Sequence, residues 1–189
     1  MARAGLDQQA VLAAAAEIAD TKGVEELTLS TLAQKLGIRP PSLYNHVHGL
    51  PGLRRQLVLY AYAKLKETLT QAAVGKAKDE AVRSLAEAYR AYVHRHPGVY
   101  EASERYADLT DPEVQRAAGE VVDLLIQVLE PYGLEHEEAI HVIRGFRSMA
   151  HGFATIERSG GFGIPLDLDV SYRKLLDAYL AGLRALYAK

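Results

Sequence analysis

Apolar residues recur every three or four positions along most of this chain, which is the spacing of one face of an α-helix. Glycine and proline interrupt the pattern at intervals and divide the chain into segments of helical length. No segment alternates apolar and polar residues in the manner of a β-strand. We therefore predict an all-α fold of about nine helices. The expected helices cover residues 6–21, 29–36, 42–47, 52–73, 78–96, 98–105, 112–129, 135–158 and 168–187.

Two short segments near the N-terminus have the layout of a helix-turn-helix. In the first, Leu29, Leu32, Ala33 and Leu36 form one apolar face. Gly37 follows directly and suits the left-handed backbone that ends many helices. The second segment opens with two prolines, whose missing N–H groups are tolerated in a first helical turn. Two short helices joined by a glycine turn are typical of proteins that read the DNA major groove.

The second segment turns most of its polar side chains outward. Leu43 and Val47 lie four residues apart and would both face the core. The outward residues carry a cation, hydroxyl groups, an amide and imidazoles; they are Arg39, Ser42, Tyr44, Asn45, His46 and His48. Such groups bind phosphate oxygens and base edges. The same composition also fits an ordinary solvated helix face, so the pattern alone leaves both interpretations open.

Several fixed spacings in this stretch coincide with those of a known family. The residues concerned are Leu32-Ala33, Leu36-Gly37-Ile38, Leu43-Tyr44-Asn45-His46-Val47 and Leu53. In them the chain resembles the N-terminal domain of TetR-family transcriptional regulators. The resemblance implies a homodimer that binds a palindromic double-stranded DNA operator, usually as a repressor. It also implies release from the operator when a small-molecule effector enters the C-terminal domain.

The resemblance further implies which residues meet the DNA. They are Thr28, Ser30, Arg39, Pro40, Pro41, Ser42, Tyr44, Asn45 and His46, with Tyr44 and His46 as phosphate contacts. The chain departs from the family at one position, because Leu50 stands where a phosphate-binding lysine is common. Arg54 and Arg55 lie within about one turn and could replace that cation.

Charge and composition change this picture only slightly. The net charge is −2, but residues 1–66 hold eight Lys or Arg against five acidic residues, whereas the remainder holds 14 against 19. The basic end is therefore the one expected to face DNA. The absence of cysteine excludes disulfides and thiolate chemistry. No apolar run approaches the roughly 20 residues that span a bilayer, and the start lacks the order of a signal peptide. We expect a cytoplasmic protein without a membrane partner.

We expect residues 1–52 to form the DNA-binding domain and residues 53–189 an effector-binding and dimerisation domain. The candidate effector pocket combines aromatic and polar side chains, although aromatics at helical spacing are more often core: Tyr89, Tyr92, Tyr100, Tyr106, Arg144, Phe146, Arg147, Met149 and His151. Arg144 and Arg147 lie on an otherwise apolar helix, and a buried cation needs an anionic partner. That partner could be an effector carboxylate or an acidic side chain of the chain itself.

Small residues mark the candidate dimer interface on the last two predicted helices. They are Gly145, Gly152, Ala178 and Gly182. Small residues on neighbouring helices allow a close approach, either within the chain or in a four-helix bundle between two subunits. His151-Gly152 also resembles a TetR subgroup with a Trp-His-Gly motif, with Ala150 at the tryptophan position.

An enzyme is the least favoured interpretation of the sequence. Paired histidines such as His94 and His96 lie two residues apart, which places them on different helix faces and suits no shared metal. We therefore expect no catalytic residue, no metal and no cofactor. The alternative to a regulator is a ligand-binding helical scaffold that no longer recognises an operator, and Leu50 is the observation that supports it.

Overall fold

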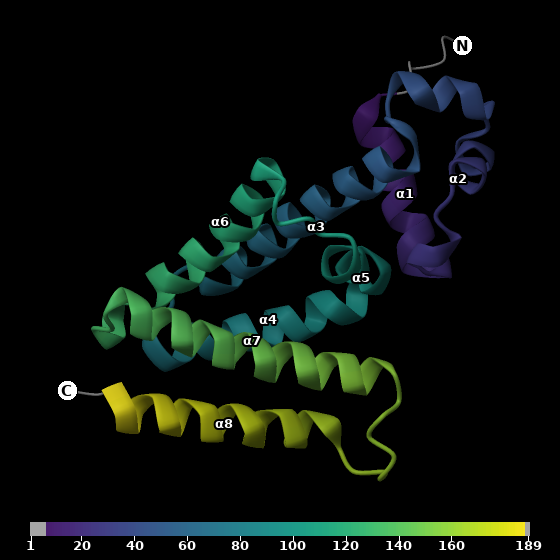
Figure 1. Cartoon of the computed structure of the whole chain (residues 1–189). Coiled ribbons are helices and arrows are strands. Elements are labelled where there is room, and N and C mark those ends of the chain that lie inside the picture. Colours follow the sequence, from purple (N-terminus) through teal and green to yellow (C-terminus); the bar gives the residue numbers. More distant parts are fainter. Residues whose placement is uncertain (1–6, 188–189) are drawn as a thin grey trace. The chain divides into compact units, whose positions relative to one another are not determined.

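The computed structural model describes residues 7–187, so Leu6, which was expected in the first helix, lies outside the described residues. Within them the fold is all-α, and the prediction of the fold class is confirmed (Figure 1). The α-helices are α1 (Gln8–Lys22), α2 (Leu29–Leu36), α3 (Gly49–Ala73), α4 (Lys78–Arg95), α5 (Pro97–Arg105), α6 (Pro112–Leu129), α7 (His136–Arg158) and α8 (Leu168–Tyr187). Three short 3-10 helices accompany them: η1 (Val24–Glu26), η2 (Pro40–Asn45) and η3 (Glu130–Tyr132). The nine expected helices correspond to the α-helices and η2.

The described chain divides into two compact units. The first comprises the chain up to Lys64 together with Arg95–Ala118, and the second comprises Leu65–His94 and Gly119–Lys189. Two of the three divisions fall inside α3 and α6, so each of these helices contributes to both units, and the third falls before the last residue of α4. The functional boundary after residue 52 rests on the family resemblance and stays a prediction.

The core of the first unit is built by α1, α2, η2, the start of α3 and α5. Leu27, Leu32 and Leu43 are fully buried in it. Val99 and Ala102 of α5 belong to the same cluster. A helix more than forty residues beyond the helix-turn-helix therefore completes the core beneath it.

A side chain of α1 caps the start of α5. The Asp20 carboxylate accepts hydrogen bonds from the backbone N–H groups of Gly98 at 3.0 Å and Val99 at 2.8 Å, and it contacts His96 Nδ1 at 3.0 Å. These bonds satisfy donors that have no partner inside the helix. A Cβ atom at Gly98 would lie 1.9 Å from the carbonyl oxygen of Ala19, so only glycine fits this contact.

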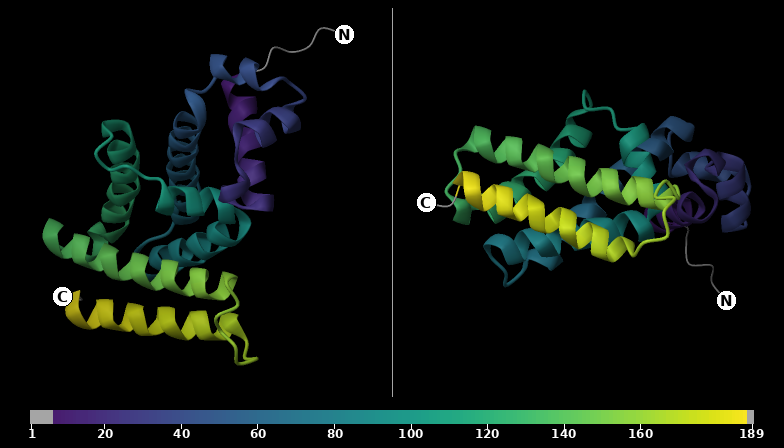
Figure 2. Two further views of the ribbon diagram at one scale, coloured as in Figure 1. Left: turned by 45° about the vertical axis from the view of Figure 1, so that its right-hand side comes forward. Right: turned by 90° about the horizontal axis from the view of Figure 1, so that it is seen from below.

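The second unit contains α4, α7 and α8 with parts of α3 and α6. α7 and α8 lie side by side and antiparallel (Figures 1 and 2). Two buried or half-buried tyrosines of α8 donate hydrogen bonds to backbone carbonyls: Tyr172 to Ala86 of α4 and Tyr179 to Val142 of α7, both at 2.7 Å. α8 is thus held to both neighbouring helices by polar as well as apolar contacts.

We predict that Gly98→Ala lowers the stability of the first unit by ~1–3 kcal/mol, because the added methyl group would overlap the backbone of α1. Urea denaturation followed by circular dichroism measures the change. Gly119→Ala in α6 is the matched control, since its Cβ would meet nothing within 4 Å. The control should be neutral or gain up to about 1 kcal/mol. Equal midpoints for both variants would contradict the close contact.

Candidate functional site

The first helix of the candidate DNA interface begins at a reciprocal threonine cap. The Thr28 hydroxyl accepts from the backbone N–H of Thr31, and the Thr31 hydroxyl accepts from the N–H of Thr28, both at 3.0 Å. The helix ends as predicted at Gly37, which has left-handed dihedral angles of φ 64° and ψ 31°. The backbone N–H of Ile38 bonds to the carbonyl of Ala33 at 3.0 Å, which closes the turn.

The second helix of the interface differs from its prediction in type and in start. It is the 3-10 helix η2, which begins at Pro40 and ends at Asn45, in each case two residues earlier than expected. The backbone N–H of Ser42 bonds to Arg39 O at 2.9 Å, and that of His46 bonds to Leu43 O at 2.8 Å. The two prolines supply no N–H for α-helical bonds, and the tighter 3-10 pattern is common in such short runs.

The polar face of η2 lies exposed as the sequence predicts. Leu43 is fully buried and Val47 is 1% exposed, whereas Tyr44 is 61% exposed. The predicted contacts Ser30, Arg39, Pro40, Pro41, Ser42 and Asn45 are also exposed, and His46 is half-buried. Thr28 is half-buried, because its hydroxyl serves the helix cap. η2 thus brings most of the predicted DNA contacts onto one short segment.

The cations of this unit differ in their partners. Lys35 pairs with Glu17 at 2.6 Å. Arg55 binds both Asp111, through Nε at 2.5 Å, and Glu113, through Nη2 at 2.7 Å. Its guanidinium lowers the pKa of Asp111 to about 2. Among residues 7–187, no hydrogen bond or ion pair to the Arg39 side chain is present.

This pattern of pairing separates the two arginines that the sequence offered in place of the lysine at position 50. Arg55 is committed to carboxylates, so it is a poor phosphate ligand. The Arg54 guanidinium instead lies over the Tyr106 ring, 4.4 Å from its centroid. Arg54 is therefore the better candidate of the two.

The predicted effector residues do not form a single cluster in the described chain. Tyr89 of α4 and Phe146 of α7 are buried in the second unit, and their rings meet edge to face at 6.4 Å. Tyr92 is buried in the same unit, and Met149 and His151 are half-buried. Tyr100 and Tyr106 belong to the first unit.

Arg144 and Arg147 do not meet the expectation of buried cations, because both are exposed on α7. Apolar periodicity locates the buried stripe of a helix, but it does not show how wide that stripe is. Their assignment as effector contacts is a separate matter and stays a prediction.

Two hollows in the second unit bear on ligand binding. The first is an apolar void of about 10 Å³ near Phe146, Tyr179, Leu85 and Leu125, which has room for little more than one water molecule. The second is an open cavity of about 600 Å³ between the start of α4, η3 and the end of α8. Of the predicted effector residues, Phe146 lines the void and none lines the larger cavity.

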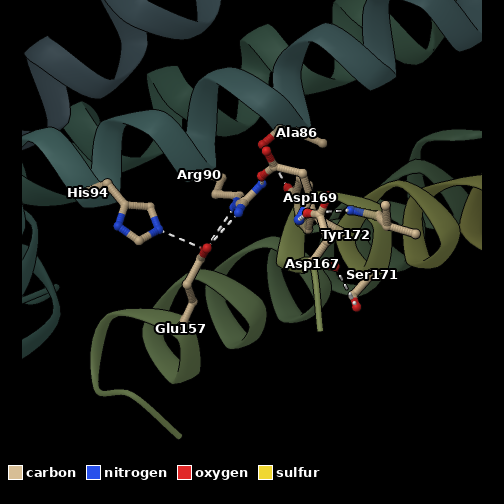
Figure 3. Close-up of polar contacts among 9 residues, drawn as sticks. Ala86, Arg90, His94, Glu157, Asp167, Asp169, Ser171 and Tyr172 are labelled. Carbon is tan, nitrogen blue, oxygen red and sulfur yellow. Dashed lines mark hydrogen bonds and ion pairs between the residues drawn. The ribbon is translucent and has the colours of Figure 1, made fainter. Parts of the chain in front are cut away.

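A polar network that the sequence analysis missed joins α4, α7 and the start of α8 (Figure 3). Arg90 donates two hydrogen bonds to Glu157, at 2.7 and 2.5 Å, and one to Asp169 at 2.8 Å. His94 Nε2 contacts the same Glu157 carboxylate at 2.7 Å. The Arg90 guanidinium also lies near the rings of Phe153 and Tyr172, at 5.4 and 5.0 Å. The sequence places Arg90 and His94 four residues apart, on one helix face. It does not show that both contact Glu157, because Glu157 is 67 residues from Arg90 along the chain.

The small residues predicted for a dimer interface fall into two groups. A Cβ atom at Gly145 would lie 3.5 Å from the Tyr179 ring, an ordinary van der Waals distance, so this position faces α8 of the same chain. A Cβ at Gly152 or Gly182 would meet nothing within 4 Å. Ala178 is exposed on α8.

No group of three or more His, Asp or Glu side chains in residues 7–187 is arranged to hold a metal ion. Every helix in the same range is too short or too polar to cross a lipid bilayer.

Known proteins share this combination of a helix-turn-helix and a helical C-terminal region. Residues 82–179 match the family model described as "Tetracyclin repressor-like, C-terminal domain". The HTH-type transcriptional regulator YobS of Bacillus subtilis is 35% identical over 182 residues, which cover 96% of this chain and 94% of the relative. The HTH-type regulator Rv0681 of Mycobacterium tuberculosis is 35% identical over 181 residues, covering 95% and 83% of the two chains.

Solved structures share the fold. A protein from Rhodococcus sp. RHA1 superimposes with a TM-score of 0.82 at 19% identity, covering 95% of this chain and 96% of its own. A TetR variant from Acinetobacter baumannii AYE, in complex with minocycline, gives a TM-score of 0.73 at 22% identity and covers 97% and 99% of the two chains.

The chain is a helix-turn-helix transcriptional regulator, which binds DNA. It belongs to the TetR family. The resemblance to the Trp-His-Gly subgroup stays a prediction.

We predict that Glu157→Gln destabilises the second unit by ~1–3 kcal/mol near neutral pH, because it removes the charge that faces the half-buried Arg90. Hydrogen bonding from Arg90 lowers the pKa of Glu157 in the folded chain. Its stabilisation is therefore present above the unfolded pKa, about 4.3, and is lost as the pH falls through the folded value. Thermal unfolding of both proteins from pH 7 to pH 3 should show the difference shrink on acidification.

Asp177→Asn is the matched control for this prediction. Asp177 also pairs with an arginine, Arg83, at 2.6 Å, but it is 61% exposed. The control should cost no more than about 1 kcal/mol at any pH. A pH-independent effect of Glu157→Gln would argue against an electrostatic role.

Proposed function

We propose that this regulator is a homodimeric repressor that binds a palindromic operator and leaves it when a small-molecule effector binds the C-terminal part of the chain. One observation carries the proposal. An exposed polar η2 follows a correctly capped α2 in a chain that is 35% identical, almost end to end, to helix-turn-helix regulators. Because such a regulator acts on the genome, we place it in the cytoplasm.

The proposed DNA contacts are those of η2 and the start of α2. Arg39 is exposed and carries a cation that can bond guanine in the major groove. Ser42, Tyr44 and Asn45 add exposed donors and acceptors on the same segment. The buried Leu43 and Val47 hold this short helix on the core, so its outer face is presented in a fixed orientation.

The proposed dimer interface is the outer face of α7 and α8. Gly182 and Ala178 leave an open stripe on α8, and Leu175 nearby is 40% exposed. A second copy packed here would form a four-helix bundle. A dimer is also what a palindrome requires, since the half-sites on one duplex face lie about 34–36 Å apart.

The proposed effector site lies in the second unit. A TetR-type relative binds minocycline, and pockets for molecules of that kind usually measure roughly 300–1000 Å³. The cavity beside α4 and α8, at about 600 Å³, has this size. The site predicted around Tyr89 and Phe146 would instead need these buried side chains to separate.

A second candidate function is a ligand-binding scaffold without operator recognition. Leu50 removes a common phosphate contact, and Arg55 is held by Asp111 and Glu113. Selection of random duplex DNA by the purified chain at near-physiological salt distinguishes the two functions. Recovery of a palindrome supports the repressor, and recovery of no preferred sequence supports the scaffold.

With the selected duplex, we predict that Arg39→Ala weakens binding by ~1–3 kcal/mol and relaxes the preference at one base pair in each half-site. Tyr44→Phe should weaken all sequences alike if the hydroxyl only touches phosphate. Lys35→Ala is the control, because Lys35 already pairs with Glu17. Fluorescence anisotropy at several salt concentrations measures all three. Equal losses for Arg39→Ala and Lys35→Ala would contradict the assigned interface.

We predict that Gly182→Arg converts the dimer to a monomer, because the arginine would stand in the proposed interface. Helix content should not fall, because the new side chain enters open space within its own chain. Light scattering gives the mass and circular dichroism the helix content. Ala91→Arg, on an exposed position of α4, should remain dimeric. A dimeric Gly182→Arg protein would exclude this face as the interface.

A further inference from the structure

A cleft of about 340 Å³ lies in the first unit, apart from the face of η2 that carries the proposed DNA contacts. Pro51 and Arg54 of α3 form one wall, and Tyr106, just after α5, and Val114 of α6 form others. Its volume falls within the usual range for small-molecule sites. The cleft therefore has room for a ligand of several heavy atoms.

The carboxylates beside the cleft already have partners. Asp111 binds Arg55 through both oxygens, and its Oδ1 also accepts from the backbone N–H of Glu113 at 2.9 Å. Asp108 Oδ1 accepts from the N–H and the hydroxyl of Thr110, at 2.9 and 2.6 Å. The second arginine of the wall, Arg55, is neutralised by Asp111 and by Glu113.

The Arg54 side chain, by contrast, has a hydrogen-bond donor without a partner in the described chain. Its Nε atom is buried, and no hydrogen-bond acceptor for it exists in residues 7–187. The Tyr106 ring covers one face of its guanidinium. A buried donor without an acceptor costs ~1–3 kcal/mol, and more when it is charged. A guanidinium stacked on a ring still presents its N–H groups along the edge of its plane, where an acceptor can lie.

We infer that this cleft binds an oxyanion, a carboxylate or phosphate group, that accepts hydrogen bonds from Arg54. Among the charged side chains that line the cleft, Asp108, Asp111 and Arg55 all have hydrogen-bond partners, whereas the buried Nε–H of Arg54 has none among the described residues, so the donor left to be satisfied there belongs to a cation. The oxyanion belongs either to a small molecule or to a phosphate of the DNA backbone. The second source rests on the proposed operator binding, whereas the first is independent of it.

An oxyanion bound here would link two segments of the first unit. Arg54 stands on α3 a few residues after η2, and Tyr106 follows α5. The occupancy of the cleft would thus depend on how these segments are held, and would in turn stabilise that arrangement. A small anion in the cleft would be a second ligand of the regulator, at a site separate from the second unit.

The experiment is NMR observation of arginine Nε–Hε signals in the full-length, ¹⁵N-labelled protein, with the Arg54 signal assigned by its loss in Arg54→Lys. Inorganic phosphate and acetate are titrated first without DNA, and the selected duplex is then added at constant ionic strength. A saturable shift of the Arg54 signal with phosphate or acetate identifies a small-molecule source. A shift that appears only with duplex identifies the DNA backbone.

The variants test whether the guanidinium itself binds. Arg54→Lys keeps the charge but lacks the planar donors, and should bind the same anion roughly tenfold more weakly or worse by calorimetry. Arg116→Lys, an exposed arginine of α6, should bind as the unaltered protein does. The inference is overturned if the Arg54 signal stays still in every titration, or moves linearly with salt as the Arg116 signal does. Anion binding without any selected palindrome would leave the inference standing while the repressor proposal fails.

Discussion

The contact between α1 and α5 is the constraint on which the first unit depends. Asp20 supplies the acceptors that the start of α5 lacks, and Gly98 lets the two backbones meet at a distance that no other residue allows. Val99 and Ala102 then enter the same core as Leu32 and Leu43. The exposed face of η2 is therefore held in place from beneath, partly by a helix that lies outside the helix-turn-helix.

The cations discussed above fall into two groups, those that pair with a carboxylate and those that do not. Arg55, Arg90 and Lys35 are bound to carboxylates of other segments, and they stabilise the fold. Arg39 and Arg54, on either side of η2, have no carboxylate partner in the described chain, and they remain available to phosphate, bases or small anions. The total charge of −2 conceals this division, because it does not distinguish paired from unpaired cations.

The sequence predicted the helices well because their ends carry strong local signals. α6 starts at Pro112, and α6 and α8 have the predicted bounds. The type of η2 was harder to foresee, since the choice between 3-10 and α-helix depends on how a short proline-led segment is anchored through Leu43. The exposure of Arg144 and Arg147, the link between Arg90 and Glu157, and the role of Gly98 all depend on which helices become neighbours. Periodicity along one helix does not contain that information.

The helix-turn-helix and its support are encoded in two separate stretches of the chain, with Asp20 in one and Gly98 in the other. Many DNA-binding modules can be cut from one regulator and joined to another at a single point. In this chain a crossover after residue 52 would part a carboxylate from the helix it caps, and would bring Ala19 against whatever residue the other parent has at position 98. A crossover at this point is thus compatible only with a parent that has a small residue at position 98 and an acceptor at position 20.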